Sequence, residues 1–218
     1  MKRPRICAVI VNNNLEPLKE VRSLVDLFEL RIDLIGDGWQ ELVKHLNKPW
    51  IACNRMIDEG GKCYKGEESR IEELLKAVEL GAEIIDIELG TRNLDEAVLK
   101  IKSRVKCLLS FHDLKETPPL DKMREIVQRQ LKSGADICKV ITNAQSSEDN
   151  LSVLQLIADF PETRIVAFAM GPLGFASRVL CPLVGGNFTY ASTEKGKESA
   201  PGQITVTDLR KLYEMMSR

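Results

Sequence analysis

The sequence predicts an α/β fold, a (β/α)8 TIM barrel that forms a single domain over residues 1–218. Short apolar runs rich in β-branched residues alternate with amphipathic helical patterns along the whole chain, which is typical of a parallel sheet covered by helices. No linker or change in composition divides the chain, and its length is near the lower limit for such a barrel. A doubly wound open sheet is the alternative. It would place a glycine-rich phosphate loop after an early strand, and VIVNNNLEP is not such a loop.

Eight runs are predicted to form the strands. In chain order they are RICAVIV (5–11), FELRIDLI (28–35), PWIACNR (49–55), EIIDIEL (83–89), KCLLSFHDL (106–114), DICKVIT (136–142), RIVAFAM (164–170) and FTYAS (188–192). Each is short and mostly apolar, as expected of a strand in a buried parallel sheet.

Helices are predicted between these strands. Residues 68–80 and 120–132 carry apolar side chains on one stripe at helical spacing. The phrase LGAEIID recurs as SGADICK, each time where a helix gives way to a strand. Gly81 and Gly134 within these phrases suit the left-handed conformation that ends many helices.

The charge balance excludes some classes of partner. The chain has 31 basic and 32 acidic side chains and no basic block, so we expect no binding to nucleic acid or to a membrane. No run predicts a signal peptide or a membrane span. The six cysteines form no CxxC pair, which favours a cytoplasmic protein with reduced thiols.

Charged residues lie on one face of several predicted strands. In residues 28–34 the apolar side chains share one face, while Glu29, Arg31 and Asp33 share the other. Since the apolar face belongs under the helices, we expect the charged face to point into the barrel. Other strands add Arg55, Asp86, Glu88, Ser110 and His112. Mutual neutralisation is one explanation, but so many polar groups in one cavity favour a polar ligand.

Lys139 lies in the middle of the apolar run DICKVIT, where an ammonium group is expensive to desolvate. A lysine that reaches solvent from a strand end is one explanation. The other is a nucleophilic amine whose pKa is lowered by burial beside cationic neighbours. Such an amine converts a ketone into an iminium ion, which acidifies the adjacent C–H. His112, on the preceding strand, has an ordinary pKa suited to moving that proton.

Six motifs together carry a family resemblance. They are ELRID (29–33), NRMIDEGG (54–61), SFHDL (110–114), DICKV (136–140), MGPLGFASRV (170–179) and ESAPGQI (198–204). In this order the chain resembles the type I 3-dehydroquinate dehydratase family over essentially its whole length. The resemblance implies a (β/α)8 barrel of the shikimate pathway of aromatic amino acid biosynthesis. It also implies dehydration of 3-dehydroquinate to 3-dehydroshikimate through a lysine Schiff base, without a metal or organic cofactor.

The resemblance also implies roles for individual residues. Lys139 would form the Schiff base with the C3 ketone, His112 would move protons between C2 and the C1 hydroxyl, and Glu59 would orient His112. Residues implied in substrate binding are Arg178 for the carboxylate, Glu29, Arg31 and Arg55 for ring hydroxyls, and Ser199 and Gln203 on a closing loop. The family resemblance further implies a homodimer.

The chain departs from the family at two places. Val9 stands where bacterial members often have a serine, and few residues precede the first strand, so we expect the N-terminal hairpin of many bacterial members to be missing.

Three other functions stay open from the residues alone. Another Schiff-base lyase or an aldolase on the same barrel would keep Lys139. A metal-dependent isomerase or epimerase would use Glu29, Asp86, Glu88 and His112 as ligands. The third function is ligand binding by a barrel without catalytic activity. It does not explain why Lys139, His112 and Glu59 are all present.

Overall fold

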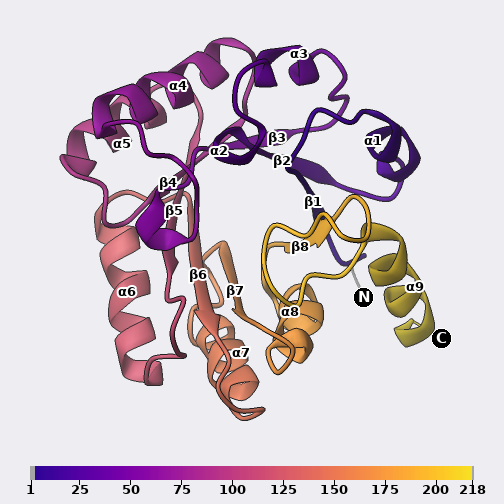
Figure 1. Cartoon of the computed structure of the whole chain (residues 1–218). Coiled ribbons are helices and arrows are strands. Elements are labelled where there is room, and N and C mark those ends of the chain that lie inside the picture. The colour runs from indigo at the N-terminus through magenta and orange to yellow at the C-terminus, as the bar shows by residue number, and fades with distance from the viewer. Residues whose placement is uncertain (1–2, 218) are drawn as a thin grey trace.

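Eight parallel strands surround a common axis in the computed structural model, which describes residues 3–217 (Figure 1). They are β1 (Ile6–Ile10), β2 (Leu27–Arg31), β3 (Trp50–Cys53), β4 (Ile84–Glu88), β5 (Lys106–His112), β6 (Ile137–Asn143), β7 (Ile165–Met170) and β8 (Thr189–Ser192). Their order is β7-β6-β5-β4-β3-β2-β1-β8, and every neighbouring pair is parallel. Each strand overlaps the run predicted for it.

The barrel is nearly closed between β7 and β8. Within residues 3–217 these two strands share no continuous ladder. The Asn187 amide donates to the Ile165 carbonyl at 2.7 Å, and the Gly171 amide donates to the Pro201 carbonyl at 3.2 Å. These two hydrogen bonds join the two ends of β7 to the segments before and after β8. The predicted (β/α)8 barrel is confirmed, and the doubly wound sheet is excluded.

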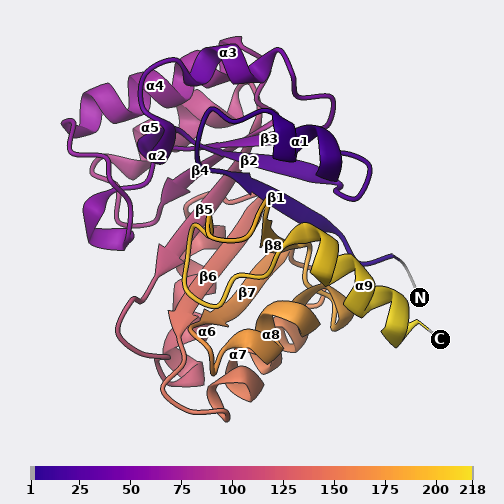
Figure 2. The ribbon, with the colours of Figure 1, turned by 45° about the vertical axis from the view of Figure 1, so that its right-hand side comes forward.

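Helices cover the outside of the barrel (Figures 1 and 2). They are α1 (Glu16–Val21), α2 (Ile32–Ile35), α3 (Trp39–Val43), η1 (Ile57–Glu59), α4 (Glu67–Glu79), α5 (Leu94–Lys102), α6 (Leu120–Lys132), α7 (Asp149–Asp159), α8 (Phe175–Leu180), η2 (Cys181–Leu183) and α9 (Val206–Met216). Gly81 and Gly134 have φ of +96° and +90°, so both predicted helix ends are confirmed. No helix described between residues 3 and 217 is long and apolar enough to cross a membrane.

Two strands end before the charged residues that were predicted to lie on them. β2 stops at Arg31, and the chain turns directly into α2, so the prediction that Asp33 lies on the inward face of a strand is wrong. The Asp33 carboxylate instead accepts two hydrogen bonds from Arg31 and one from the Lys62 amide, which fixes the turn. β3 ends at Cys53, so Arg55 reaches the barrel from the following segment.

The barrel interior changes from apolar to polar along the strands. Leu27, Ile84, Leu108 and Ile137 belong to an apolar cluster inside the barrel, near the amino ends of their strands. Two positions later on the same strands stand Glu29, Asp86, Ser110 and Lys139, all buried. Because alternate strand residues face the same side, each polar side chain lies above an apolar one. The apolar layer therefore closes the floor of a polar chamber.

Candidate active site

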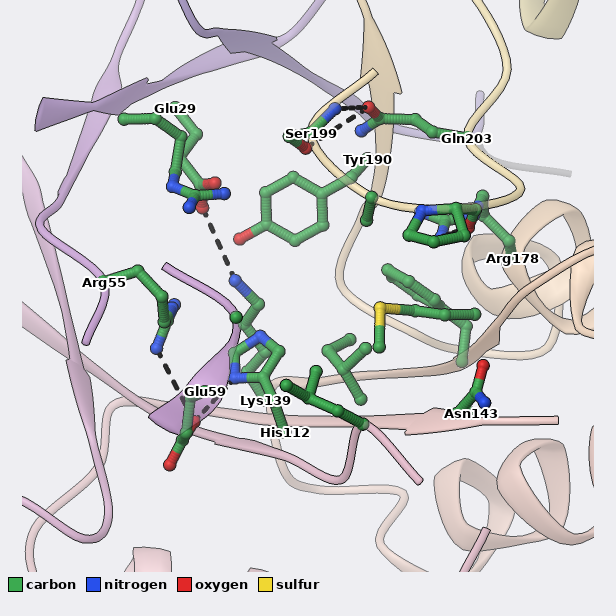
Figure 3. Close-up of a pocket in the computed structure, with 18 residues that line it drawn as sticks. Glu29, Arg55, Glu59, His112, Lys139, Asn143, Arg178, Tyr190, Ser199 and Gln203 are labelled. Atoms are coloured by element: carbon green, nitrogen blue, oxygen red, sulfur yellow. Dashed lines mark hydrogen bonds and ion pairs between the residues drawn. The ribbon is translucent and has the colours of Figure 1, made fainter. Parts of the chain in front are cut away.

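The carboxyl ends of the strands surround a cavity of about 320 Å³ (Figure 3). Barrel enzymes place their active sites at this end. All nine side chains predicted for the site line the cavity, namely Glu29, Arg31, Arg55, Glu59, His112, Lys139, Arg178, Ser199 and Gln203. The structure thus gathers residues from six separate stretches of sequence.

Lys139 projects from β6 into the barrel and is only 4% exposed, so the explanation that it reaches solvent is wrong. Its Nζ lies 2.8 Å from Asp86 and 3.5 Å from Glu29. Burial disfavours the ammonium form, but attraction to Asp86 and then Glu29 outweighs burial and raises the pKa of Lys139. The expectation of a lowered pKa is therefore wrong, because the attraction to Asp86 and Glu29 outweighs both burial and the repulsion from Arg55.

Asp86 is the anion at the centre of the chamber. Its carboxylate accepts hydrogen bonds from Lys139, from Arg55 at 2.7 Å and from the Ser110 hydroxyl at 2.6 Å. Burial opposes ionisation, yet Arg55 and then Lys139 outweigh it and lower the pKa of Asp86. The aspartate therefore stays charged and fixes two cations at set positions. The sequence suggested a polar Asp86 inside the barrel but not this central place.

His112, at the end of β5, is coupled to Glu59 in η1. The His112 Nδ1 and Glu59 Oε2 atoms lie 2.7 Å apart, a hydrogen bond that orients the ring (Figure 3). Burial, and then the charges of Arg55 and Lys139, lower the pKa of His112 well below its ordinary value. Burial raises the pKa of Glu59 to about 8. The imidazole is therefore neutral at neutral pH and able to accept a proton.

Like Lys139, the two arginines Arg55 and Arg31 are tied to carboxylates beside them. Arg55 contacts Glu88 at 3.1 Å in addition to Asp86. Arg31 is held by Asp33 through two hydrogen bonds of 2.9 Å and 2.7 Å. Each guanidinium is thereby fixed in orientation, with its charge compensated before any ligand arrives.

Arg178, on α8, differs from these because no carboxylate of residues 3–217 lies within ion-pair distance of it. It is 1% exposed, and its Nε makes no hydrogen bond with the described residues. The guanidinium stacks on the Phe168 ring at 4.3 Å, and its Nη2 donates to the Pro201 carbonyl at 3.3 Å. Burial lowers the pKa of Arg178 to about 10. A buried cation without an anion is a ready site for a carboxylate.

The loop after β8 covers the cavity. The Ser199 amide and hydroxyl both donate to the Gln203 Oε1, at 2.8 Å and 3.2 Å, which makes a compact turn facing the cavity. Gly202 lies so close to the β7 end that a Cβ there would come within 2.4 Å of the Gly171 carbonyl oxygen. This close approach seats the loop against the barrel, with Ser199 and Gln203 on its inner side.

The predicted alternative metal site is not assembled as proposed. Among residues 3–217, Glu29 and Asp86 group with Cys53, whereas Glu88 and His112 stand outside the group. The Lys139 ammonium already faces both of these carboxylates. The geometry therefore favours the Lys139 ammonium group, and not a metal ion, as the cation between Glu29 and Asp86.

Sequence reasoning missed two polar residues of the cavity. Tyr190, on β8, and Asn143, at the end of β6, both line it. Strand alternation within FTYAS was the available signal for Tyr190, because Phe188 and Tyr190 share the inward face. Val9, the departure noted in the sequence, is buried in the apolar cluster inside the barrel and does not line the cavity.

The fold and the site define a class of protein, a (β/α)8-barrel enzyme with a buried lysine and a histidine–carboxylate pair at the carboxyl ends of its strands. The family model for type I 3-dehydroquinase matches residues 6–218. The chain is 44% identical over 214 residues to a 3-dehydroquinate dehydratase of Dehalococcoides mccartyi, covering 98% of this chain and 96% of the relative. It is 36% identical to a Methanococcus maripaludis protein of the same name, covering 97% and 99%.

A solved structure supports the same assignment. The 3-dehydroquinate dehydratase of Aquifex aeolicus superimposes with a TM-score of 0.82 at 28% identity, covering 98% of this chain and 99% of that one. The chain belongs to the type I 3-dehydroquinase family. The family predicted from the sequence motifs is confirmed.

Proposed function

We propose that Lys139, His112 and Glu59 carry out the dehydration of 3-dehydroquinate to 3-dehydroshikimate, with Arg178 holding the substrate carboxylate. The activity itself, that of a hydro-lyase of the shikimate pathway, agrees with the family and with the names of the relatives, so the predicted enzyme class is confirmed. Cytoplasmic location and a homodimer stay predictions.

One observation carries the assignment of roles. The cavity holds four buried cations, and Arg178 alone lacks a carboxylate partner among residues 3–217. A substrate with one carboxylate compensates this charge, and its ring then extends across the cavity toward Lys139. Ser199 and Gln203 close over the bound ring, and Glu29, Arg31 and Arg55 face its hydroxyl groups. Binding therefore brings the ketone to the amine.

The chemistry follows from the charges around Lys139. Since the ammonium form is favoured at rest, a proton must leave Nζ before it attacks C3, and the neutral His112 is a suitable acceptor. His112 returns this proton to the hydroxyl of the first adduct, which leaves as water and gives the iminium ion, so the imidazole is neutral again. The iminium ion acidifies the C–H bonds at C2. His112 takes a C2 proton and returns it to the C1 hydroxyl, which leaves as water. Hydrolysis of the imine then frees the product.

The test follows formation of the conjugated enone in 3-dehydroshikimate by ultraviolet absorbance, with and without a chelator. We expect turnover by the wild type in both conditions and none by Lys139→Met. Lys106→Met, which changes an exposed lysine at the other end of the barrel, serves as the matched control and should retain activity. Loss of activity with chelator would favour the metal-dependent class, and activity in Lys139→Met would remove the assigned nucleophile.

A further inference from the structure

Tyr190, on β8, is a buried polar residue beside Lys139 in the cavity. It is 4% exposed, and its ring lies 4.5 Å from the Lys139 Nζ atom. Edge-to-face contacts with Phe188 and Phe168, at 5.3 Å and 6.3 Å between centroids, fix the ring plane. The hydroxyl points into the cavity toward Glu29 and Lys139 (Figure 3).

The Tyr190 hydroxyl has no hydrogen-bond partner among residues 3–217, and neither has the Glu29 Oε2 atom. Buried polar atoms without partners are rare in folded proteins, and these two, in the same cavity as the Arg178 Nε atom, call for an explanation. Burial, and then the charge of Glu29, raise the pKa of Tyr190 well above its ordinary value, so the hydroxyl keeps its proton and is available as a donor. Glu29 Oε2 is an acceptor. A single ligand group that both accepts and donates a hydrogen bond satisfies the Tyr190 hydroxyl and the Glu29 Oε2 atom together.

A hydroxyl group is such a ligand group. Glu29 Oε2 lies 3.5 Å from the Lys139 Nζ, so the group that bridges Tyr190 and Glu29 must be attached close to the carbon that bonds to Nζ. In 3-dehydroquinate that carbon is C3. The neighbouring C4 carries a hydroxyl, on the side of the ketone opposite to C2.

We propose that Tyr190 is a further substrate-binding residue, whose hydroxyl donates a hydrogen bond to the C4 hydroxyl while that hydroxyl donates to Glu29. This inference rests on the proposed function. Tyr190 and Glu29 together fix the ring on the C4 side of the imine, and Arg178 fixes it on the carboxylate side. The C2 hydrogens are thereby turned toward His112.

The test compares Tyr190→Phe with the wild type on 3-dehydroquinate and on its 4-deoxy analogue. Phenylalanine keeps the ring contact with Lys139 and the packing on Phe168, and removes only the hydroxyl. Loss of one hydrogen bond should lower kcat/KM for 3-dehydroquinate by about 3- to 10-fold. On the 4-deoxy analogue, Tyr190→Phe and the wild type should have the same kcat/KM, because the C4 hydroxyl that would bond to Tyr190 is missing.

Tyr213→Phe is the matched control. Tyr213 is another buried tyrosine, but its hydroxyl donates to the Val179 carbonyl at 2.8 Å outside the cavity. We expect Tyr213→Phe to lower the melting temperature and leave kcat/KM unchanged. Tyr190→Phe should keep or raise the melting temperature, because it removes an unpartnered buried hydroxyl.

Three results would overturn the role of Tyr190 while leaving the proposed function intact. They are unchanged kinetics of Tyr190→Phe, an equal loss on both substrates, and a melting temperature lowered as in Tyr213→Phe. A wild type that forms no enone from 3-dehydroquinate would overturn both the role and the proposed function.

Discussion

Replacing Arg178 with methionine should abolish tight substrate binding and yet stabilise the folded protein. The Arg178 charge is buried and has no carboxylate partner among residues 3–217. A fall in pKa from 12.5 to about 10 corresponds to a cost of about 3 kcal/mol for the charged form. Because the pKa in the folded state is the lower one, this cost is fully present below pH 10 and disappears as the pH rises toward 12.5.

Two contacts of Arg178 offset part of this cost. Stacking on Phe168 contributes about 1 kcal/mol, and the long hydrogen bond to Pro201 contributes about as much. Methionine keeps the volume and loses the charge, so the net gain in free energy of unfolding is about 1 kcal/mol. In a chain of this size that gain raises the melting temperature by about 2–4 °C.

The effect on binding has the opposite sign. Removing one partner of a desolvated charge pair costs about 2–5 kcal/mol, so kcat/KM should fall by at least about 30-fold. Thermal unfolding followed by circular dichroism and steady-state kinetics on the same preparations measure both effects. Arg70→Met is the control, because Arg70 is equally buried but is paired with Glu67 and Glu88. Its loss should destabilise the fold by about 3–5 kcal/mol.

A destabilised Arg178→Met protein would refute this reasoning, since it would show that the charge is compensated in the free enzyme. Near wild-type kinetics in Arg178→Met would show that another cation, Arg31 or Arg55, takes the carboxylate.

Two further predictions concern the histidine pair. His112→Ala should slow the elimination by about 10²–10⁴-fold and let a covalent adduct accumulate on Lys139, visible in an intact-mass spectrum; normal turnover would show that the histidine is structural. Glu59→Gln should lower kcat less than His112→Ala does, because it disturbs the 2.7 Å hydrogen bond that orients the His112 ring but leaves the imidazole in place. An unchanged kcat would mean that Glu59 does not orient His112.

Most of the fold could be predicted because the signals for it are local. Each strand lies within a short, mostly apolar run, and the helix ends at Gly81 and Gly134 have the left-handed backbone conformation that glycine favours. The error at Asp33 has a different origin. Alternation of side chains continues past Arg31 in the sequence, but the Asp33 carboxylate forms a turn with Arg31 and Lys62, and this long-range contact ends the strand.

The site was predictable in its membership but not in its electrostatics. Lys139 was recognisable as a buried amine from its own strand alone. The direction of its pKa depends on Asp86 and Glu29, which lie 53 and 110 positions earlier in the chain, and their distances from Nζ follow only from the folded barrel. Tyr190 was missed because an aromatic residue on an inward strand face is usually a packing residue.

The central claim is that the Lys139 amine bonds covalently to the substrate. Borohydride reduction of the enzyme in the presence of 3-dehydroquinate, followed by peptide mass mapping, tests it directly. We expect one adduct, located on Lys139 and absent when substrate is omitted. An adduct on another lysine, or none while the enzyme turns over, would contradict the account.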